Sequence, residues 1–236
     1  GPGRMVRMPA GSTVWSEPAD VEVGAVQFAS FGTRIAMLTM ATNPYRGWVQ
    51  ISSDDGVTWG PKLPVGFQGI AGGVFPSGLA WVDDGTPDGK MFAVGYRGGV
   101  YISTSADAGA TWTVRPKLTN DGTYSEASVI QAADGRLVAL ARREPANQVA
   151  RLEQWTSHDL GDTWTLDGSV IPGGMSIPLM TLMPDGAILV PFRDATRNQS
   201  HSYAMTVDHG ATWLTYRLND ERNMYAQFAT RGANRA

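Results

Sequence analysis

The sequence contains no cysteine, and this absence excludes disulfide bonds and thiolate metal sites. Only 3 of the 236 residues are histidines, and they do not form a cluster of metal ligands. No Glu stands at the spacing that a calcium-binding loop requires. The composition therefore predicts a protein with no metal and no cofactor.

Charge and long apolar runs are also scarce. Charged residues make up 17% of the chain, the net charge is −3, and no basic stripe suggests contact with nucleic acid. No apolar run reaches the length of about 20 residues that a membrane-spanning helix needs. We therefore expect neither a nucleic-acid partner nor membrane insertion. The 28 glycines and 14 prolines are typical of a turn-rich β protein.

One eight-residue pattern, [Ser/Thr]-x-Asp-x-Gly-x-Thr-Trp, occurs four times in the chain. Its aspartates are 53, 52 and 49 residues apart, a period that indicates one supersecondary unit per repeat. The Asp and Gly favour a tight turn between two strands, and the Trp is expected to be buried between neighbouring units. The Asp and Trp residues of the four copies are Asp54, Trp59, Asp107, Trp112, Asp159, Trp164, Asp208 and Trp213.

Each repeat is predicted to form four short strands. In the third repeat these are residues 125–132, 136–143, 150–157 and 163–169, with a hairpin turn at Asp134-Gly135. The other repeats follow the same order, and no helical pattern separates them. The fold class is therefore all-β, built from four sheets of four strands in a single domain spanning residues 1–236.

The repeated pattern resembles the Asp-box, or BNR repeat, of sialidase-like β-propellers, and the resemblance covers about residues 20–220. It implies that each four-stranded unit is one propeller blade. Residues 223–230, 4–8 and 12–15 are then predicted to form a fifth blade from both termini, which would close the ring and remove open sheet edges. Sialidases usually have six blades, so a fragment of a six-bladed propeller is the alternative.

The most specific constellation outside the repeats is Glu126 and Arg142. A three-residue turn at Ala133–Gly135 would place them opposite each other across a hairpin, whereas a two-residue turn would pair Glu126 with Arg143. This stretch resembles the sialidase segment that carries a catalytic Glu and a carboxylate-binding Arg. The resemblance implies a catalytic role for Glu126 and a substrate-binding role for Arg142. The alternative is an ion pair that only fixes the hairpin.

Arginines recur at equivalent ends of the second strand in successive repeats. They are Arg97, Arg142 or Arg143, and Arg193, and together they are candidates for a substrate-binding funnel that attracts anions. Arg142 is expected to contact the ligand and Glu126 to hold it in place. Replacement of Arg142 is then expected to abolish binding with little change in the melting temperature. Simple inheritance of one residue through the repeats is the alternative.

The rest of the sialidase pattern is met poorly. The early Arg of that family has no match in residues 25–31, its Asp general acid would fall near Thr39, and its nucleophilic Tyr would fall near Ile177. Tyr124, Tyr203 and Tyr225 remain tyrosine candidates without an assigned role. Hydrolysis of a glycoside needs a proton donor and a nucleophile or base at a fixed separation, and the sequence does not identify that pair.

The sequence therefore favours a glycan-recognising, sialidase-like propeller with weak or no sialidase activity. The partner would be a glycan or other small acidic carbohydrate, and an extracellular or surface location, virions included, is favoured. One alternative is an active exo-glycosidase of the sialidase type acting on acidic sugars. Another is a non-catalytic module for protein interaction or for attachment to a cell or virion surface. The oligomeric state stays open.

Overall fold

The computed structural model describes residues 3–5, 14, 16–17, 19–21, 25–42, 45–198 and 200–219. Within these ranges the regular elements are β-strands, apart from one 3-10 turn, η1, at Ala195–Arg197. The same part of the chain contains no helix that is long and apolar enough to span a membrane. The predicted all-β class is confirmed.

Four sheets each consist of antiparallel strands that follow one another along the chain. The first contains β3 (Ala25–Phe31), β4 (Arg34–Thr42), β5 (Tyr45–Ser52) and β6 (Leu63–Pro64). The second contains β7 (Phe75–Val82), β8 (Lys90–Tyr96), β9 (Val100–Ser105) and β10 (Thr113–Val114). The third contains β11 (Tyr124–Gln131), β12 (Leu137–Arg143), β13 (Arg151–Ser157) and β14 (Thr165–Pro172). The fourth contains β15 (Gly174–Met175), β16 (Thr181–Leu182), β17 (Ile188–Asp194), β18 (Ser200–Thr206) and β19 (Leu214–Asn219).

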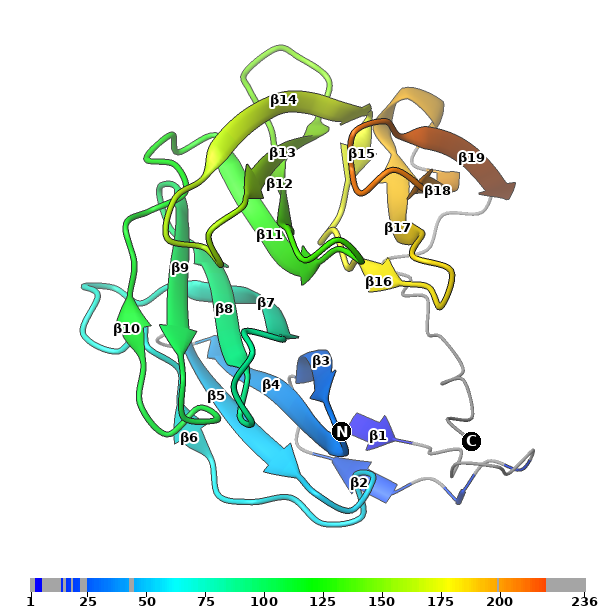
Figure 1. Cartoon of the computed structure of the whole chain (residues 1–236). Helices are drawn as coiled ribbons and strands as arrows, with labels where there is room; N and C mark the ends of the chain where they lie inside the picture. Colours follow the sequence, from blue (N-terminus) through cyan, green and yellow to red (C-terminus); the bar gives the residue numbers. More distant parts are fainter. Residues whose placement is uncertain are drawn as a thin grey trace.

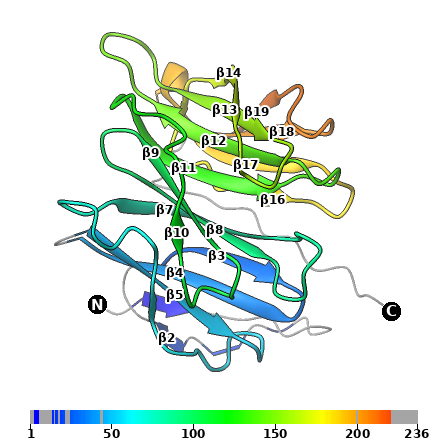
Figure 2. The same ribbon diagram turned by 60° about the vertical axis from the view of Figure 1, so that its left-hand side comes forward.

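The four sheets are arranged around a common centre as the blades of a β-propeller (Figures 1 and 2). The first strands β3, β7 and β11 are innermost and contact one another in sequence, and β11 contacts β16 of the fourth blade. Direct hydrogen bonds link neighbouring blades there. Gln27 Oε1 accepts from the backbone N–H of Leu79 at 2.8 Å, and Ser77 Oγ donates to the carbonyl of Ala127 at 2.9 Å. The four blades therefore correspond to the four repeats of the sequence.

A separate two-stranded sheet lies at the N-terminal side. It pairs β1 (Gly3–Met5) with β2 (Ala19–Val21), antiparallel. The predicted fifth blade needs residues 223–230 and most of residues 6–15, and these lie outside the described residues. The composite blade stays a prediction.

The hydrophobic core is divided among the interfaces between blades. On β12, Leu137, Ala139 and Ala141 belong to a cluster shared with the second blade, while Val138 and Leu140 belong to one shared with the fourth. Both faces of this strand are buried, so its sequence is a nearly continuous apolar run.

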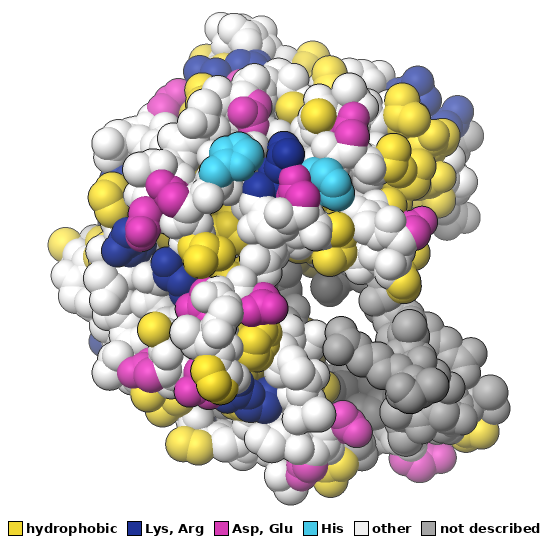
Figure 3. All heavy atoms as spheres, in the orientation of Figure 1, with side chains coloured by type: hydrophobic (Ala, Val, Ile, Leu, Met, Phe, Trp, Pro, Cys, Tyr) yellow, Lys and Arg dark blue, Asp and Glu magenta, His cyan; other side chains and the backbone are white. Residues whose placement is uncertain are grey.

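On the molecular surface, acidic, basic and apolar side chains are interspersed over the face shown in Figure 3.

Each copy of the repeated pattern forms the turn between the third and fourth strands of its blade, as predicted. In the second copy, Asp107 Oδ1 accepts hydrogen bonds from Ser105 Oγ (2.7 Å) and from the Thr111 backbone N–H (2.8 Å). Its Oδ2 accepts one from Thr111 Oγ1, and the Gly109 N–H donates to Ser105 Oγ at 2.8 Å. The other three copies repeat these contacts.

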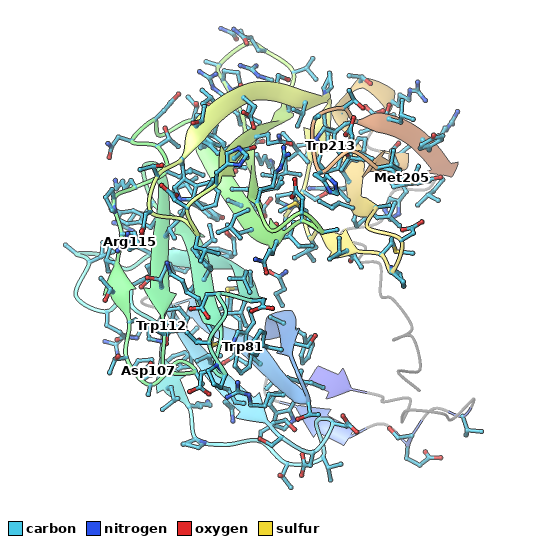
Figure 4. All side chains as sticks on the ribbon, viewed as in Figure 1. Trp81, Asp107, Trp112, Arg115, Met205 and Trp213 are labelled. Carbon is cyan, nitrogen blue, oxygen red and sulfur yellow. The ribbon has the colours of Figure 1, made fainter. Side chains whose placement is uncertain are left out.

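The four repeat tryptophans are mostly buried, as expected, although none is completely buried, because each follows an exposed turn at the edge of its blade. Trp112, Trp164 and Trp213 still pack against three different core clusters, and Figure 4 shows Trp112 beside Asp107. Trp59 contacts the exposed Phe28 instead, with ring centroids 6.2 Å apart.

The repeat aspartates predict a loss of stability in acid. Hydrogen bonds from the Thr side chain and backbone of each turn lower the pKa of Asp54, Asp159 and Asp208 to about 2, and they lower the pKa of Asp107 as well. Because the folded-state pKa lies below the unfolded value of about 3.9, these carboxylates stabilise the fold fully above that value. Their contribution is lost as the pH falls through about 2.

We therefore expect the melting temperature to fall steeply between about pH 4 and pH 2. Asp159→Asn, which removes one titrating group, should flatten this dependence and lower the melting temperature at neutral pH. Melting curves across the pH range would measure both effects. If the melting temperature fell equally steeply with pH in the wild type and in Asp159→Asn, the acid sensitivity could not be assigned to the repeat aspartates.

Candidate functional site

The direction of the strands divides the residues of each blade between two faces of the propeller. The repeat turns lie at one face of the propeller, and each of them follows the third strand of its blade. The third strand therefore begins at the opposite face. Because neighbouring strands are antiparallel, the first strand also begins there and the second strand ends there. We call this the distal face. All five candidate residues lie at these strand ends: Arg97, Glu126, Arg142, Arg143 and Arg193.

Glu126 and Arg142 form the ion pair that the longer hairpin turn predicts. The register of β11 and β12 pairs Ala127 with Ala141 and, after a β-bulge, Tyr124 with Arg143. The bulge places Ser125 and Glu126 together opposite Arg142. Arg142 Nη1 lies 2.7 Å from Glu126 Oε2. The pairing of Glu126 with Arg143, which a two-residue turn would give, does not occur.

The Arg142 guanidinium is already committed to carboxylates of its own chain. Nη1 donates to Glu126 and Nη2 donates to Glu144 Oε1, while only 13% of the side chain is exposed. Burial acts to lower the pKa of Arg142, but the hydrogen bonds to Glu126 and Glu144 outweigh burial and raise it. This arrangement suits an internal ion pair better than a direct clamp on a ligand.

A second polar cluster, which the sequence did not reveal, lies on the other side of the same blade. The Tyr124 hydroxyl donates to Glu153 Oε2, and Glu153 Oε1 accepts from Arg143 Nη1 (3.1 Å) and Arg151 Nε (2.7 Å). Arg143 Nη2 also lies 3.3 Å from Asp121 Oδ2. Glu153 is only 4% exposed, and the two arginines compensate its charge.

These contacts fix the protonation of the tyrosine and the glutamate. Burial and the hydrogen bond to Glu153 raise the pKa of the Tyr124 phenol. Burial acts to raise the pKa of Glu153, but hydrogen bonds from Tyr124, Arg151 and Arg143 outweigh burial and lower it. At neutral pH the pair is therefore a neutral phenol donating to a carboxylate. A phenol with a raised pKa is a weak nucleophile.

A hollow of about 310 Å³ opens next to this cluster at the distal face. Its walls are mainly aromatic: the ring of Phe75 lies 5.2 Å from that of Tyr45 and 5.0 Å from that of Tyr96. Tyr124 and Arg97 complete the walls together with Gly98, Gly122 and Ser125. The residues come from three blades, so the sequence alone does not place them together.

Arg97 is the exposed cation of this hollow. Its Nη1 donates to the Gly72 carbonyl at 2.9 Å, and it has no carboxylate partner among the residues that the structure describes. Gly72 has a φ of 76°, and a Cβ there would lie 2.3 Å from the Arg97 guanidinium. The glycine therefore permits the contact that holds the Arg97 side chain in place.

The structure does not bring all four candidate arginines into one site. Arg97 lines the hollow with Tyr124, and Arg143 Cζ lies 5.1 Å from the centre of the Tyr124 ring. Arg142 lies on the opposite side of β12, the side that faces the fourth blade. Arg193 belongs to that fourth blade, where its backbone N–H donates to Ser176 Oγ at 3.2 Å. In the described ranges no three His, Asp or Glu residues are grouped to hold a metal ion.

Comparison with solved structures identifies the class of fold. The Hadza microbial sialidase superposes with a TM-score of 0.60 at 17% identity, over 80% of this chain and 45% of the sialidase. Trypanosoma rangeli sialidase gives 0.56 at 16% identity, over 91% of this chain and 43% of the enzyme. A protein of unknown function from Dyadobacter fermentans gives 0.57 at 16%, over 82% of this chain and 68% of the other.

The chain thus has a sialidase-like propeller fold and spans less than half the length of the two sialidases. No protein-family model matches its sequence, and no curated protein does. At these identities the likeness concerns the fold.

Proposed function

We propose that this propeller recognises an acidic or polar glycan at its distal face and hydrolyses sialosides weakly or not at all. The observation that carries the proposal is the aromatic hollow that holds the exposed Arg97 guanidinium. Aromatic rings present flat apolar surfaces to the apolar faces of sugars, and a guanidinium binds a carboxylate through two parallel hydrogen bonds. A concave site with a few convergent polar groups suits a small ligand.

The roles of the other candidate residues follow from their contacts. Arg97 would contact the anionic group of the ligand. Arg143 would support the wall of the hollow beneath Tyr124. Glu126 and Arg142 would hold the rim of the third blade, and Arg193 would contribute positive charge from the fourth. Trypanosoma rangeli sialidase has been solved with sialic acid bound, and a carboxylated sugar of this kind is the first ligand to test. A cell-surface or virion location would suit a glycan partner.

Weak or absent hydrolysis is supported by the contacts of Glu126 and Glu153 and by the raised pKa of Tyr124. Cleavage needs a proton donor together with a nucleophile or base. Glu126 is paired with Arg142, Glu153 is held by two arginines, and the raised pKa of Tyr124 opposes its use as a nucleophile. Both glutamates are thus engaged by arginines of the same chain, and the phenol is held neutral by its hydrogen bond to Glu153.

One observation favours the alternative of an active exo-glycosidase. By resemblance to sialidases, a glutamate activates a tyrosine nucleophile, and here the Tyr124 hydroxyl donates to Glu153. If this pair were catalytic, the purified chain would release sialic acid from a fluorogenic sialoside, and Tyr124→Phe would abolish the release. Rapid release by the wild type would replace the binding proposal with the enzyme.

The binding proposal is tested by titrating the purified chain with sialic acid and with neutral sugars. Arg97→Gln should weaken binding of the acidic sugar by at least about tenfold, because a hydrogen bond to a charged group contributes about 1.5–3 kcal/mol. Arg136→Gln is the matched control, since Arg136 follows the β11–β12 turn at the other end of the strands. Equal affinities of Arg97→Gln and Arg136→Gln would reject the hollow as the site.

A further inference from the structure

A second hollow adjoins the first along the distal face. It has a volume of about 210 Å³ and lies between the start of β5 and the loop that follows β6. Its lining includes Tyr45, Arg46, Phe67, Ile70 and Gly73. Tyr45 therefore lines both hollows.

The loop between the two hollows is held close to both. Gly73 pairs with Tyr45 in an isolated parallel bridge, and a Cβ at Gly73 would lie 2.4 Å from the Tyr45 carbonyl oxygen. Its neighbour Gly72 lines the second hollow and accepts the hydrogen bond from Arg97, which lines the first. Two glycines with φ of 76° and 77° thus let one loop contact the walls of both hollows.

Each hollow carries its own exposed arginine. Arg46 is exposed, and within the described ranges no carboxylate or other hydrogen-bond partner engages its side chain. Arg97 is likewise exposed and bonded only to a backbone carbonyl there. Most other arginines of the distal face are neutralised by carboxylates, as Arg142, Arg143 and Arg151 are. Arg46 thus lines one of the two hollows that share Tyr45, and Arg97 lines the other.

The sizes of the hollows also favour a ligand that occupies both. Ligand pockets commonly measure about 300–1,000 Å³, so the first hollow is at the lower limit and the second is below it. Neither alone would enclose a large ligand. A chain of linked sugars can occupy two adjoining small hollows and stack against the aromatic residue that they share.

We infer that the ligand is an acidic oligosaccharide with at least two anionic sugars, one held at Arg97 and the next at Arg46. This inference rests on the proposed function and specifies the class of its ligand. The anionic group is a carboxylate or a sulfate, since a guanidinium binds both. Linking the two sugars makes the second contact intramolecular, so a longer chain should bind more tightly than a single sugar.

The test compares affinities for saccharides of increasing length. The carboxylated probes are sialic acid, its α2,8-linked dimer and tetramer, and trigalacturonic acid; the sulfated probe is a heparin-derived tetrasaccharide. The wild type should bind the best tetramer or trimer at least about tenfold more tightly than the single acidic sugar. Because heparin carries carboxylates as well as sulfates, tighter binding of the heparin tetrasaccharide than of every carboxylated probe would assign the contact to sulfate, and otherwise the contact is to carboxylate.

Four variants test whether the gain in affinity comes from the second hollow. Arg46→Gln should reduce the affinity for the longer chain to that for the single sugar and leave the single sugar unaffected. Arg97→Gln should weaken both. Arg136→Gln, on the other face, should change neither, and Arg46→Lys should retain part of the gain because it retains the charge. Melting curves of each variant would establish that it is folded.

The outcomes separate the two proposals. Binding of a single acidic sugar with no gain from length, or a gain that survives in Arg46→Gln, would overturn the two-sugar inference and leave the proposed function standing. Failure of every acidic saccharide to bind would overturn the two-sugar inference, and failure of the neutral sugars as well would overturn the proposed function.

Discussion

Arg142→Ala is expected to lower the free energy of unfolding by about 3–5 kcal/mol, because it breaks a buried ion pair. The side chains of Arg142 and Glu126 are only 13% and 8% exposed, and their atoms are 2.7 Å apart. Chemical denaturation of the purified variant would measure the change. The burial of the pair replaces the expectation, drawn from the sequence, that this substitution leaves the melting temperature nearly unchanged.

Two further variants make this result specific to the ion pair. Arg97→Ala is the matched control, because it removes the same side chain from an exposed position without a carboxylate partner in the described residues, and it should change the stability little. Glu126→Ala combined with Arg142→Ala should cost less than the sum of the single changes, since neither charge is then left alone. Equal stabilities of Arg142→Ala and Arg97→Ala would contradict the role given to the pair.

Replacing the repeat tryptophans by alanine is the second change with a large expected effect. Truncation of a large aromatic side chain in a core costs about 3–5 kcal/mol, and partial burial places Trp112, Trp164 and Trp213 near the lower end of that range. Trp213 Nε1 also donates to Gln154 Oε1 at 2.8 Å, and Trp112 Nε1 donates to the Gly109 carbonyl at 3.0 Å.

The first repeat provides an internal comparison. Trp59 occupies the same place in its turn but contacts the exposed Phe28, so Trp59→Ala should cost clearly less than the other three substitutions. Guanidinium denaturation of the four variants under one set of conditions would rank them. Four equal losses would show that the turn, and not the core contact, determines the contribution of the indole.

The blades could be predicted from the sequence because their interactions are local. Each repeat turn is closed by hydrogen bonds within eight residues, and the strands of each of the first three blades pair in chain order. The register that joins Glu126 to Arg142 depends only on the length of one hairpin turn, so the sequence could predict it once that length was chosen. The exact degree of burial of each indole could not be predicted, because it depends on where neighbouring blades end.

The hollow and the tyrosine–glutamate contact could not be found in the same way. Tyr45, Phe75, Tyr96 and Tyr124 come from three blades, and no pattern within one repeat relates them. Tyr124 and Glu153 share a blade but are joined across its first and third strands. The Arg151-x-Glu153 spacing in β13 was the only local signal, because alternate residues of a strand share one face.

The sequence by itself determined the all-β class, the four blades and the place of each turn, and it limited the partner of Glu126 to Arg142 or Arg143. These features depend on turn chemistry and strand alternation, which act over a few residues. Only the tertiary structure decided which arginines are neutralised and which stay exposed at the distal face. Arg142 and Arg143 meet carboxylates of their own blade, whereas Arg97 meets the backbone carbonyl of Gly72, and these contacts depend on how strands and loops come together in space.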